Sequence, residues 1–258
     1  MTSTPAAERG ATTEDGFLGG RLRIRQPVRG FRAGVDAVLL AAATSAQPGQ
    51  TVLELGCGVG TAALCLMARV PDLTVTGVEV QPDYAALAEA NAAANGMALE
   101  VITADLAALP ADLRQRGFDH VIANPPYYDR AASTAATDPG RDVALAGDTP
   151  LADWIAVAAR RLRPGGQLTL IQRIARLPEV LTALEGRVGS VVLRPLAPRG
   201  GRAATLFVLG ARKGGRAAFH LSAPLVLHDG PVHGHDGEDY SPLARAILRD
   251  GAALPLRD

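Results

Sequence analysis

The sequence predicts an α/β protein with a doubly wound, mostly parallel sheet of seven strands, the last of them antiparallel. Two observations support this fold class. From residue 46 onward, short apolar runs bounded by glycine or proline alternate with helix-forming runs, as expected for strands buried beneath helices. The apolar run 52–55 leads into three alternating glycines and then a helical segment. A strand, a glycine turn and a helix form the corner at which such sheets bind nucleotides.

The composition excludes several classes of protein. A chain of 258 residues with 48% hydrophobic residues suits one domain with one good core. The formal net charge is zero, so any affinity for nucleic acid must come from local patches. Cys57 and Cys65 are too few for a disulfide framework or a zinc site, and we expect both to be buried. The sequence has no long apolar run, so we expect a soluble, cytoplasmic protein with no membrane partner. We also expect no metal.

The chain divides into a lead and one domain. Residues 1–16 have no apolar period and are predicted to be disordered. Residues 17–258 form the domain, with an N-terminal strand and helix (17–45), a core (46–213) and a C-terminal tail (214–258). Alternation around Leu22 and Ile24 predicts a strand or hairpin within 17–28. Its arginines form either a charged edge or a phosphate-binding stripe: Arg21, Arg23, Arg25, Arg29 and Arg32.

The other elements follow from local pattern and turn residues. Strands are predicted at 52–55, 73–78, 99–103, 118–123, 167–172, 190–196 and 203–211. Helices are predicted at 37–45, 61–70, 82–94, 151–162, 178–185 and 243–248, with Trp154 as a core residue. We expect a turn at 163–166 before the fifth strand, and an antiparallel hairpin with its tip at 198–202.

The glycine turn and two carboxylates indicate a ligand that carries a ribose. Gly56, Gly58 and Gly60 allow positive φ and a close approach to the backbone, and Glu54 stands two residues before them. Glu79 ends the next strand, roughly 20 residues beyond the glycines, where an acidic residue commonly binds ribose hydroxyls. A carboxylate can accept hydrogen bonds from both hydroxyls of a cis-diol.

The pattern E-x-G-x-G-x-G resembles the first motif of class I S-adenosylmethionine-dependent methyltransferases. The resemblance implies a Rossmann-like fold and S-adenosylmethionine as cofactor, with the glycines and Glu54 beside its methionine part. It also implies that Asp105 binds the adenine amino group and that Phe31 and Asp36 close over the methionine side. As residues alone, Asp105 also suits a turn, although we favour the functional role, and Asp36 equally suits a helix N-cap.

Asn124-Pro125-Pro126-Tyr127 stands at the end of the fourth strand, next to the cofactor corner. The Asn124 side-chain oxygen and the Pro125 carbonyl can accept both N–H bonds of a planar amino group, whose lone pair is otherwise delocalised. Pro126 makes the turn rigid, and Tyr127 offers a flat face for a base. N-P-P-Y resembles the signature of methyltransferases that act on adenine N6, cytosine N4, guanine N2 or glutamine amides.

From about residue 18 onward, the chain resembles bacterial tRNA adenine-N6 methyltransferases of the TrmN type. The resemblance rests on G-F-R-x-x-x-D-A-V-L-L-A, ELGCGVGT, NPPYY and a late Y-S-P-x-A-x-A-I-L tail. It implies an RNA substrate, a tRNA. One alternative is a release-factor glutamine methyltransferase, a family that shares N-P-P-Y but carries a helical domain before the sheet. Another is an RNA-binding protein that binds S-adenosylmethionine without turnover, against which the intact tetrapeptide argues.

Three further segments carry polar residues of possible function. The irregular segment 128–150 is predicted to be a mobile lid over the substrate. The segment 228–240 is rich in His and Asp, but its glycines and loop setting argue against a metal site. Basic residues around the last strand form either a solvated hairpin or, as we expect, one phosphate-contacting patch beside the cleft: Arg194, Arg199, Arg202, Arg212, Lys213 and Arg216.

Overall fold

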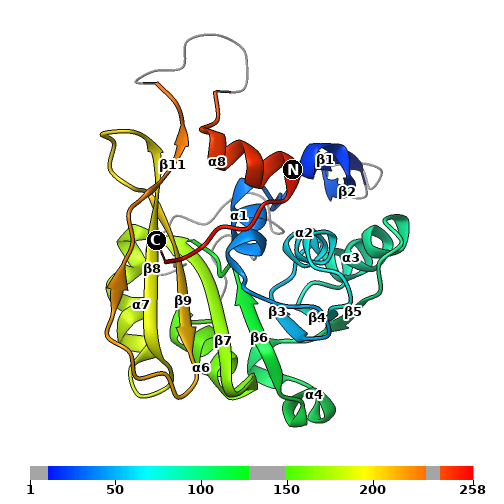
Figure 1. The fold of residues 1–258 in the computed structure, drawn as a ribbon. Coiled ribbons are helices and arrows are strands. Elements are labelled where there is room, and N and C mark those ends of the chain that lie inside the picture. The colour runs from blue at the N-terminus through cyan, green and yellow to red at the C-terminus, as the bar shows by residue number, and fades with distance from the viewer. Residues whose placement is uncertain (1–10, 128–148, 231–238, 258) are drawn as a thin grey trace, which may run out of the picture.

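The computed structural model describes residues 11–127, 149–230 and 239–257 (Figure 1). Three parts of the sequence-based expectations lie outside these residues. They are the disorder expected before residue 11, nearly all of the predicted lid, and positions 231–238 of the His- and Asp-rich segment.

The described residues form a central sheet of nine strands in the order β10-β8-β9-β7-β6-β3-β4-β5, with β11 also beside β8. Only β9 runs antiparallel to its neighbours, β7 and β8. The fold class is therefore confirmed, but the prediction of seven strands is wrong, because the predicted tail supplies two more. The strands are β3 (Thr51–Leu55), β4 (Thr74–Glu79), β5 (Leu99–Thr103), β6 (Phe118–Ala123), β7 (Leu162–Arg173), β8 (Gly189–Arg199), β9 (Leu206–Arg212), β10 (His220–Leu221) and β11 (Leu225–His228).

Helices cover both faces of this sheet, so the molecule has three layers. The α-helices are α1 (Val35–Ala43), α2 (Thr61–Arg69), α3 (Pro82–Ala94), α4 (Ala111–Gln115), α6 (Leu151–Arg161), α7 (Leu177–Leu184) and α8 (Pro242–Arg245). Short turns of other helical types are η2 (Leu18–Gly20), η3 (Leu106–Ala108), η5 (Ile174–Arg176) and η6 (Ala246–Asp250). Among the described residues, none of the helices combines the length and apolarity that crossing a bilayer requires.

Alternating side chains of the strands build two separate cores. Val52 of β3 faces a core that it shares with α1 and α2, whereas Leu53 and Leu55 face a second core with α6 and α7. Likewise, Ile122 of β6 belongs to the first core and Val121 to the second. The two-residue period of a strand thus explains why uninterrupted apolar runs suit a sheet covered on both faces.

The N-terminal hairpin corrects one prediction. β1 (Thr12–Phe17) pairs antiparallel with β2 (Leu22–Pro27), so residues 12–16 are a strand and not disordered. The sequence TTEDGF has no apolar alternation that would indicate a strand. Its order comes from pairing with β2, whose Leu22 and Ile24 are buried as predicted.

The other edge of β2 is covered by two asparagine side chains, Asn91 of α3 and Asn95 at the C-cap of the same helix. The Asn91 amide accepts the N–H of Arg25 at 2.8 Å and donates to its carbonyl at 3.0 Å. Asn95 does the same to Arg23, at 3.1 and 2.8 Å. The two side chains therefore satisfy the backbone groups that a neighbouring strand would otherwise bind.

The same hairpin explains the arginine stripe. The Glu14 carboxylate of β1 lies 3.0 Å from Arg23 and 4.0 Å from Arg25, and Asp15 lies 2.5 Å from Arg32. Ion pairs this exposed contribute little to stability, about 0–1 kcal/mol each. They do provide local counter-charges for three of the arginines, which favours the charged edge over the phosphate-binding stripe.

The turn expected at 163–166 is part of β7. Pairing between β6 and β7 shifts its register between Phe118 and His120, so the extra residues form a bulge. The Gly165 N–H donates to the Lys213 carbonyl at 3.1 Å, and the Lys213 N–H donates to Gly166 at 2.9 Å. These bonds continue the ladder with the chain that leaves β9, which is why the segment remains extended.

Candidate active site

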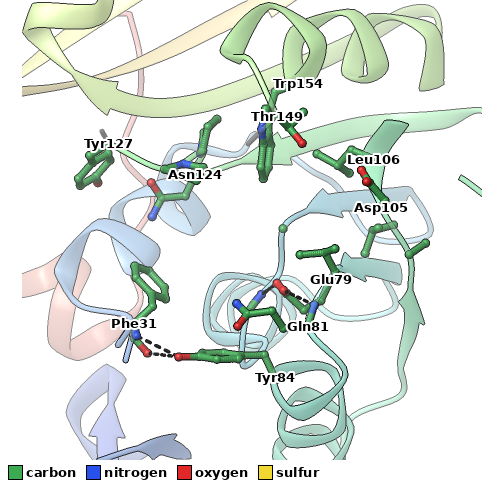
Figure 2. Close-up of a pocket in the computed structure, with 17 residues that line it drawn as sticks. Phe31, Glu79, Gln81, Tyr84, Asp105, Leu106, Asn124, Tyr127, Thr149 and Trp154 are labelled. Atoms are coloured by element: carbon green, nitrogen blue, oxygen red, sulfur yellow. Dashed lines mark hydrogen bonds between the residues drawn. The ribbon is translucent and has the colours of Figure 1, made fainter. Parts of the chain in front are cut away.

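A pocket of 210 Å³ lies at the carboxyl ends of β3, β4, β5 and β6, as expected for a parallel sheet (Figure 2). Most of the predicted site residues line it: Phe31, Gly56, Gly58, Glu79, Asp105, Asn124, Pro125, Pro126 and Tyr127. Three others, Asp36, Glu54 and Gly60, lie outside its lining. The segments that carry these residues are far apart in the chain, and the sheet topology brings them together.

The glycine turn is tightly enclosed on one side and open towards the pocket on the other. A Cβ on Gly56, whose φ is +65°, would stand 2.5 Å from the Trp154 ring. A Cβ on Gly58, whose φ is +55°, would meet only the Phe31 ring, at 3.9 Å. The space beside the Gly58 Cα is therefore open on the pocket side, which leaves room for a ligand to approach this backbone. Trp154, predicted as a core residue, is buried and also lines the pocket.

Glu54 and Gly60 support this turn from behind. The Glu54 carboxylate is buried and accepts the Ala63 N–H of α2 at 2.9 Å. Burial, with a smaller contribution from the nearby Glu79 carboxylate, raises the pKa of Glu54 to about 8, although the Ala63 hydrogen bond opposes the increase. At Gly60, a Cβ would stand 3.3 Å from Ala88 of α3, so this glycine permits close packing. The structure thus places both residues behind the turn that faces the ligand.

Glu79 joins two stretches of backbone at the floor of the pocket. Its carboxylate oxygens accept the N–H of Gly58 and the N–H of Gln81, each at 2.9 Å (Figure 2). Burial raises the pKa of Glu79, and these N–H bonds lower it. Each oxygen has a second lone pair, so the carboxylate can also accept hydrogen bonds from a ligand.

The structure shows one of the two roles that the sequence left open for Asp105. Its Oδ1 accepts the Ala107 N–H at 2.8 Å and so caps η3. Its side chain is also exposed along the pocket wall, where Leu106 lies next to it. The turn interpretation is confirmed, and a ligand contact stays a prediction.

The N-P-P-Y turn is bound to Asp36 in the first turn of α1. Asn124 Nδ2 donates to Asp36 Oδ2 at 3.2 Å, and the Tyr127 hydroxyl donates to the same oxygen at 2.7 Å. Asp36 is not the helix N-cap, because Gly34 occupies that position. Asn124 Oδ1 is buried and has no hydrogen-bond partner among the described residues. An acceptor in this state can bind an incoming N–H group.

Two side chains that the sequence analysis did not select hold the backbone of this turn. Gln172, fully buried at the end of β7, donates to the carbonyls of Pro125 at 3.2 Å and Pro126 at 3.4 Å. Arg176 donates to the Pro126 carbonyl at 2.9 Å. The Pro125 carbonyl, predicted to bind the target amino group, therefore already has one partner. A glutamine in the apolar run QLTLIQ was the available signal.

Tyr127 has a defined orientation and one covered face. The Arg173 guanidinium lies 5.5 Å from the centroid of its ring. A base that stacks on Tyr127 must therefore use the opposite face or displace the guanidinium. Burial raises the pKa of Tyr127 strongly, and the Asp36 carboxylate contributes to the increase. The phenol is thus a hydrogen-bond donor and not an acid at neutral pH.

The remaining pocket residues were not predicted. The Tyr84 hydroxyl accepts the Phe31 N–H at 2.9 Å and donates to the Phe31 carbonyl at 3.3 Å, which holds Phe31 over the pocket (Figure 2). Val80, directly after Glu79, is 51% exposed and offers an apolar surface for a flat ring. Its position directly after the carboxylate at the end of β4 could have identified Val80 as a pocket residue from the sequence. The lining is completed by Val78, Gln81, Ala104, Leu106 and Thr149.

The basic residues around β9 do not form one patch. Leu206 pairs with Arg173 at the pocket end of the sheet, whereas Arg212 pairs with Gln167 at the opposite end. Arg199 and Arg202 therefore lie at the pocket end, and Lys213 and Arg216 follow Arg212 at the far end. Arg194 is buried within the sheet. The prediction of a single patch is wrong because the strand between the two groups is extended.

His228 and Asp239, at the ends of the His- and Asp-rich segment, contact each other. His228 Nδ1 lies 2.6 Å from Asp239 Oδ1, and its ring stacks on Tyr240 at 4.8 Å. Asp239 also pairs with Arg199. Within the residues that the structure describes, no group of three or more His, Cys, Asp and Glu side chains gathers as metal ligands would.

Comparisons with known proteins show what the chain is similar to. Residues 33–193 match the model of the methyltransferase small domain family. The chain is 34% identical over 169 residues to a tRNA1(Val) (adenine(37)-N6)-methyltransferase of Porphyromonas gingivalis, covering 62% of this chain and 66% of the relative. It is 35% identical over 126 residues to a release factor glutamine methyltransferase of Deinococcus radiodurans, covering 46% and 44%. The chain thus spans just under two thirds of the first relative and under half of the second.

A solved structure extends the similarity to most of the fold. The crystal structure of a predicted O-methyltransferase from Agrobacterium tumefaciens superposes with a TM-score of 0.69 at 28% identity. The superposition covers 85% of this chain and 98% of that one.

Proposed function

Because the chain belongs to the methyltransferase small domain family, we propose that it is an S-adenosylmethionine-dependent N-methyltransferase acting on adenine N6 of a tRNA. The observation that carries this proposal is the buried, unpartnered Oδ1 of Asn124, a residue that lines the pocket. A tRNA substrate would place the enzyme in the cytoplasm.

The pocket fits the proposed cofactor. Gly58 offers backbone that a ligand can approach, and Glu79 offers carboxylate lone pairs for two ribose hydroxyls. Val80 and Leu106 supply apolar surface for an adenine ring, and Asp105 supplies an acceptor for its amino group. When bound, S-adenosylmethionine supplies an electrophilic methyl group on a sulfonium. The family's known cofactor therefore agrees with the chemistry of the lining.

The acceptor side suits a planar amino group. Leaving a buried oxygen such as Asn124 Oδ1 without a partner costs about 1–3 kcal/mol, which an N–H of the substrate would offset. The Pro125 carbonyl has a second lone pair beyond the one used by Gln172 and can accept the other N–H. Holding both N–H bonds directs the nitrogen lone pair towards the methyl group. The methylated nitrogen then releases its extra proton to water, so no general base is required.

The choice of tRNA rests on two supports. The relative from Porphyromonas gingivalis is named for adenine N6 of a tRNA, and its similarity extends over 169 residues. Tyr127 beside Asn124 offers one aromatic face on which the target base can stack, worth roughly 1–3 kcal/mol. The second candidate function is methylation of a release-factor glutamine, favoured by the similarity to the Deinococcus radiodurans enzyme. A glutamine amide would meet the same two acceptors.

Labelled S-adenosylmethionine offered with unmodified tRNA and release factor side by side tests the function. We expect label in tRNA. Asn124→Ala should lower turnover by roughly 10²-fold or more and leave cofactor affinity nearly intact. Tyr127→Phe retains the aromatic face and should be mild, whereas Tyr127→Ala should be severe. Label in release factor alone would select the second candidate. Full activity of Asn124→Ala on either substrate would contradict the mechanism.

A further inference from the structure

Asp36 connects both functional side chains of the N-P-P-Y turn to a helix far away in the sequence. Its Oδ2 accepts from Asn124 Nδ2 and from the Tyr127 hydroxyl, across 88 and 91 residues of chain. Its Oδ1 accepts the Gly34 N–H at 3.3 Å. Both carboxylate oxygens are thus bonded to protein, and Asp36 is not part of the pocket lining.

These contacts decide which end of the Asn124 amide meets the substrate. A side-chain amide has a donor end and an acceptor end, which a half-turn exchanges. With the ends exchanged, Asn124 would present N–H groups to the N–H groups of an incoming amine, and the two would repel. A carboxylate accepts hydrogen bonds and donates none, so Asp36 binds only the NH2 end. The oxygen is then left for the substrate, consistent with the unpartnered Oδ1.

We propose that Asp36 is a positioning residue, which fixes Asn124 Oδ1 towards the target amino group and holds the Tyr127 ring in its stacking orientation. The inference deepens the proposed function and rests on it for the identity of the acceptor. It differs from the role that the sequence resemblance implied, closure over the methionine part of the cofactor. The two roles predict different effects of Asp36→Ala on cofactor affinity: a positioning residue leaves the Kd unchanged, and a residue that closes over the cofactor weakens binding.

The orientation itself is measurable without a substrate. In a ¹⁵N–¹H spectrum, the side-chain NH2 signal of Asn124 is assigned by its loss in Asn124→Ala. Asp36→Ala should shift this signal, because the carboxylate acceptor is removed. The matched control is Asp112→Ala, which removes an exposed aspartate from the first turn of α4. An Asn124 signal that stays in place in folded Asp36→Ala would overturn the proposal.

Cofactor binding and turnover separate positioning from cofactor contact. Calorimetry with S-adenosylmethionine should give the same Kd for Asp36→Ala and wild type. Single-turnover rates on unmodified tRNA at saturating cofactor should fall about 10- to 100-fold, the cost of a misplaced group. Asp36→Asn, whose amide oxygen still accepts one donor, should recover part of the rate. It also provides a folded variant if Asp36→Ala is unstable.

A double variant tests whether Asp36 acts through Asn124. The rate loss of Asp36→Ala combined with Asn124→Ala should be smaller than the product of the two single losses. A rate loss in the double variant equal to the product of the two single losses would contradict the proposal. A weaker cofactor Kd in Asp36→Ala with an unchanged rate at saturating cofactor would also contradict it. If wild-type protein methylates neither tRNA nor release factor, the proposed function fails, and the spectrum still decides whether Asp36 orients Asn124.

Discussion

Glu79 supports the shape of the pocket, and we propose that it also binds the ribose of the cofactor. Because its carboxylate already accepts the Gly58 and Gln81 N–H groups, Glu79→Ala removes the ribose acceptor and releases two loops. We expect cofactor binding, measured by calorimetry, to weaken by about 1–3 kcal/mol. Glu79→Gln keeps one acceptor oxygen, so its cofactor affinity should lie between those of wild type and Glu79→Ala. Glu89→Ala, an exposed glutamate of α3, is the control. An unchanged Kd in Glu79→Ala would exclude Glu79 from the cofactor site.

Glu54 should make the stability of the protein depend on pH. Burial raises its pKa from 4.5 to about 8, so the folded state retains the proton longer than the unfolded state does. The resulting stabilisation is complete below about pH 4.5 and is lost as the pH rises towards 8. Urea unfolding across this range should show wild type losing stability relative to Glu54→Gln. A difference between the two proteins that is constant with pH would contradict the buried, protonated carboxyl.

The sequence predicted which residues gather at the site better than what each one contacts. Asn124, Glu79 and Asp105 line the pocket because strand ends of a parallel sheet converge at one edge. The carboxylate of Asp36 and the amide of Gln172 face the turn across long stretches of chain, and local pattern carries no information about such contacts. A motif therefore predicts which residues line the pocket more reliably than it predicts what each of them contacts.

Among the elements, the strand–turn–helix corner offers the sharpest stability test. Gly56→Ala adds a Cβ 2.5 Å from the Trp154 ring at a residue with φ +65°. Gly96→Ala is the matched control, because Gly96 has φ +66° and nothing lies within 4 Å of its added Cβ. Both variants suffer the backbone strain, but only Gly56→Ala should suffer about 1–3 kcal/mol more from overpacking. The measurement is urea unfolding, and equal losses would contradict the close packing of Trp154.

The predictability of each element follows from how it is stabilised. β5 and β6 have the predicted bounds, since glycine and proline frame strands with clear apolar patterns. β1 is polar and ordered by its pairing partner, and β10 has only two residues. Residues 163–166 of β7 have the proline–glycine sequence of a turn, but backbone hydrogen bonds to the segment after β9 hold them extended. Tertiary pairing determined the elements that the sequence missed.

At the scale of the whole molecule, β9 sets the position of the surface cations. Its seven residues separate Arg202 from Arg216 by roughly 20 Å along the sheet. Of these two arginines, Arg202 lies at the pocket end and Arg216 at the far end, so Arg202 is the one placed to contact RNA bound at the pocket. Arg202→Ala should lower the salt dependence of tRNA affinity by about one unit of slope, and Arg216→Ala should leave it unchanged. Equal slopes for both variants would remove the tip of the β8–β9 hairpin from the RNA interface.

The asparagine cover on β2 bears on how the protein avoids aggregation. An open strand edge offers backbone N–H and C=O groups to any other chain, but Asn91 and Asn95 occupy those of β2. This protection exists only once α3 has formed and docked. A chain that is still folding therefore has an unpaired β2 edge, which the native protein lacks. Asn91→Ala with Asn95→Ala should therefore increase light scattering during refolding at high concentration. The selectivity of the native hairpin for its own chain would thus depend on two side chains of a neighbouring helix.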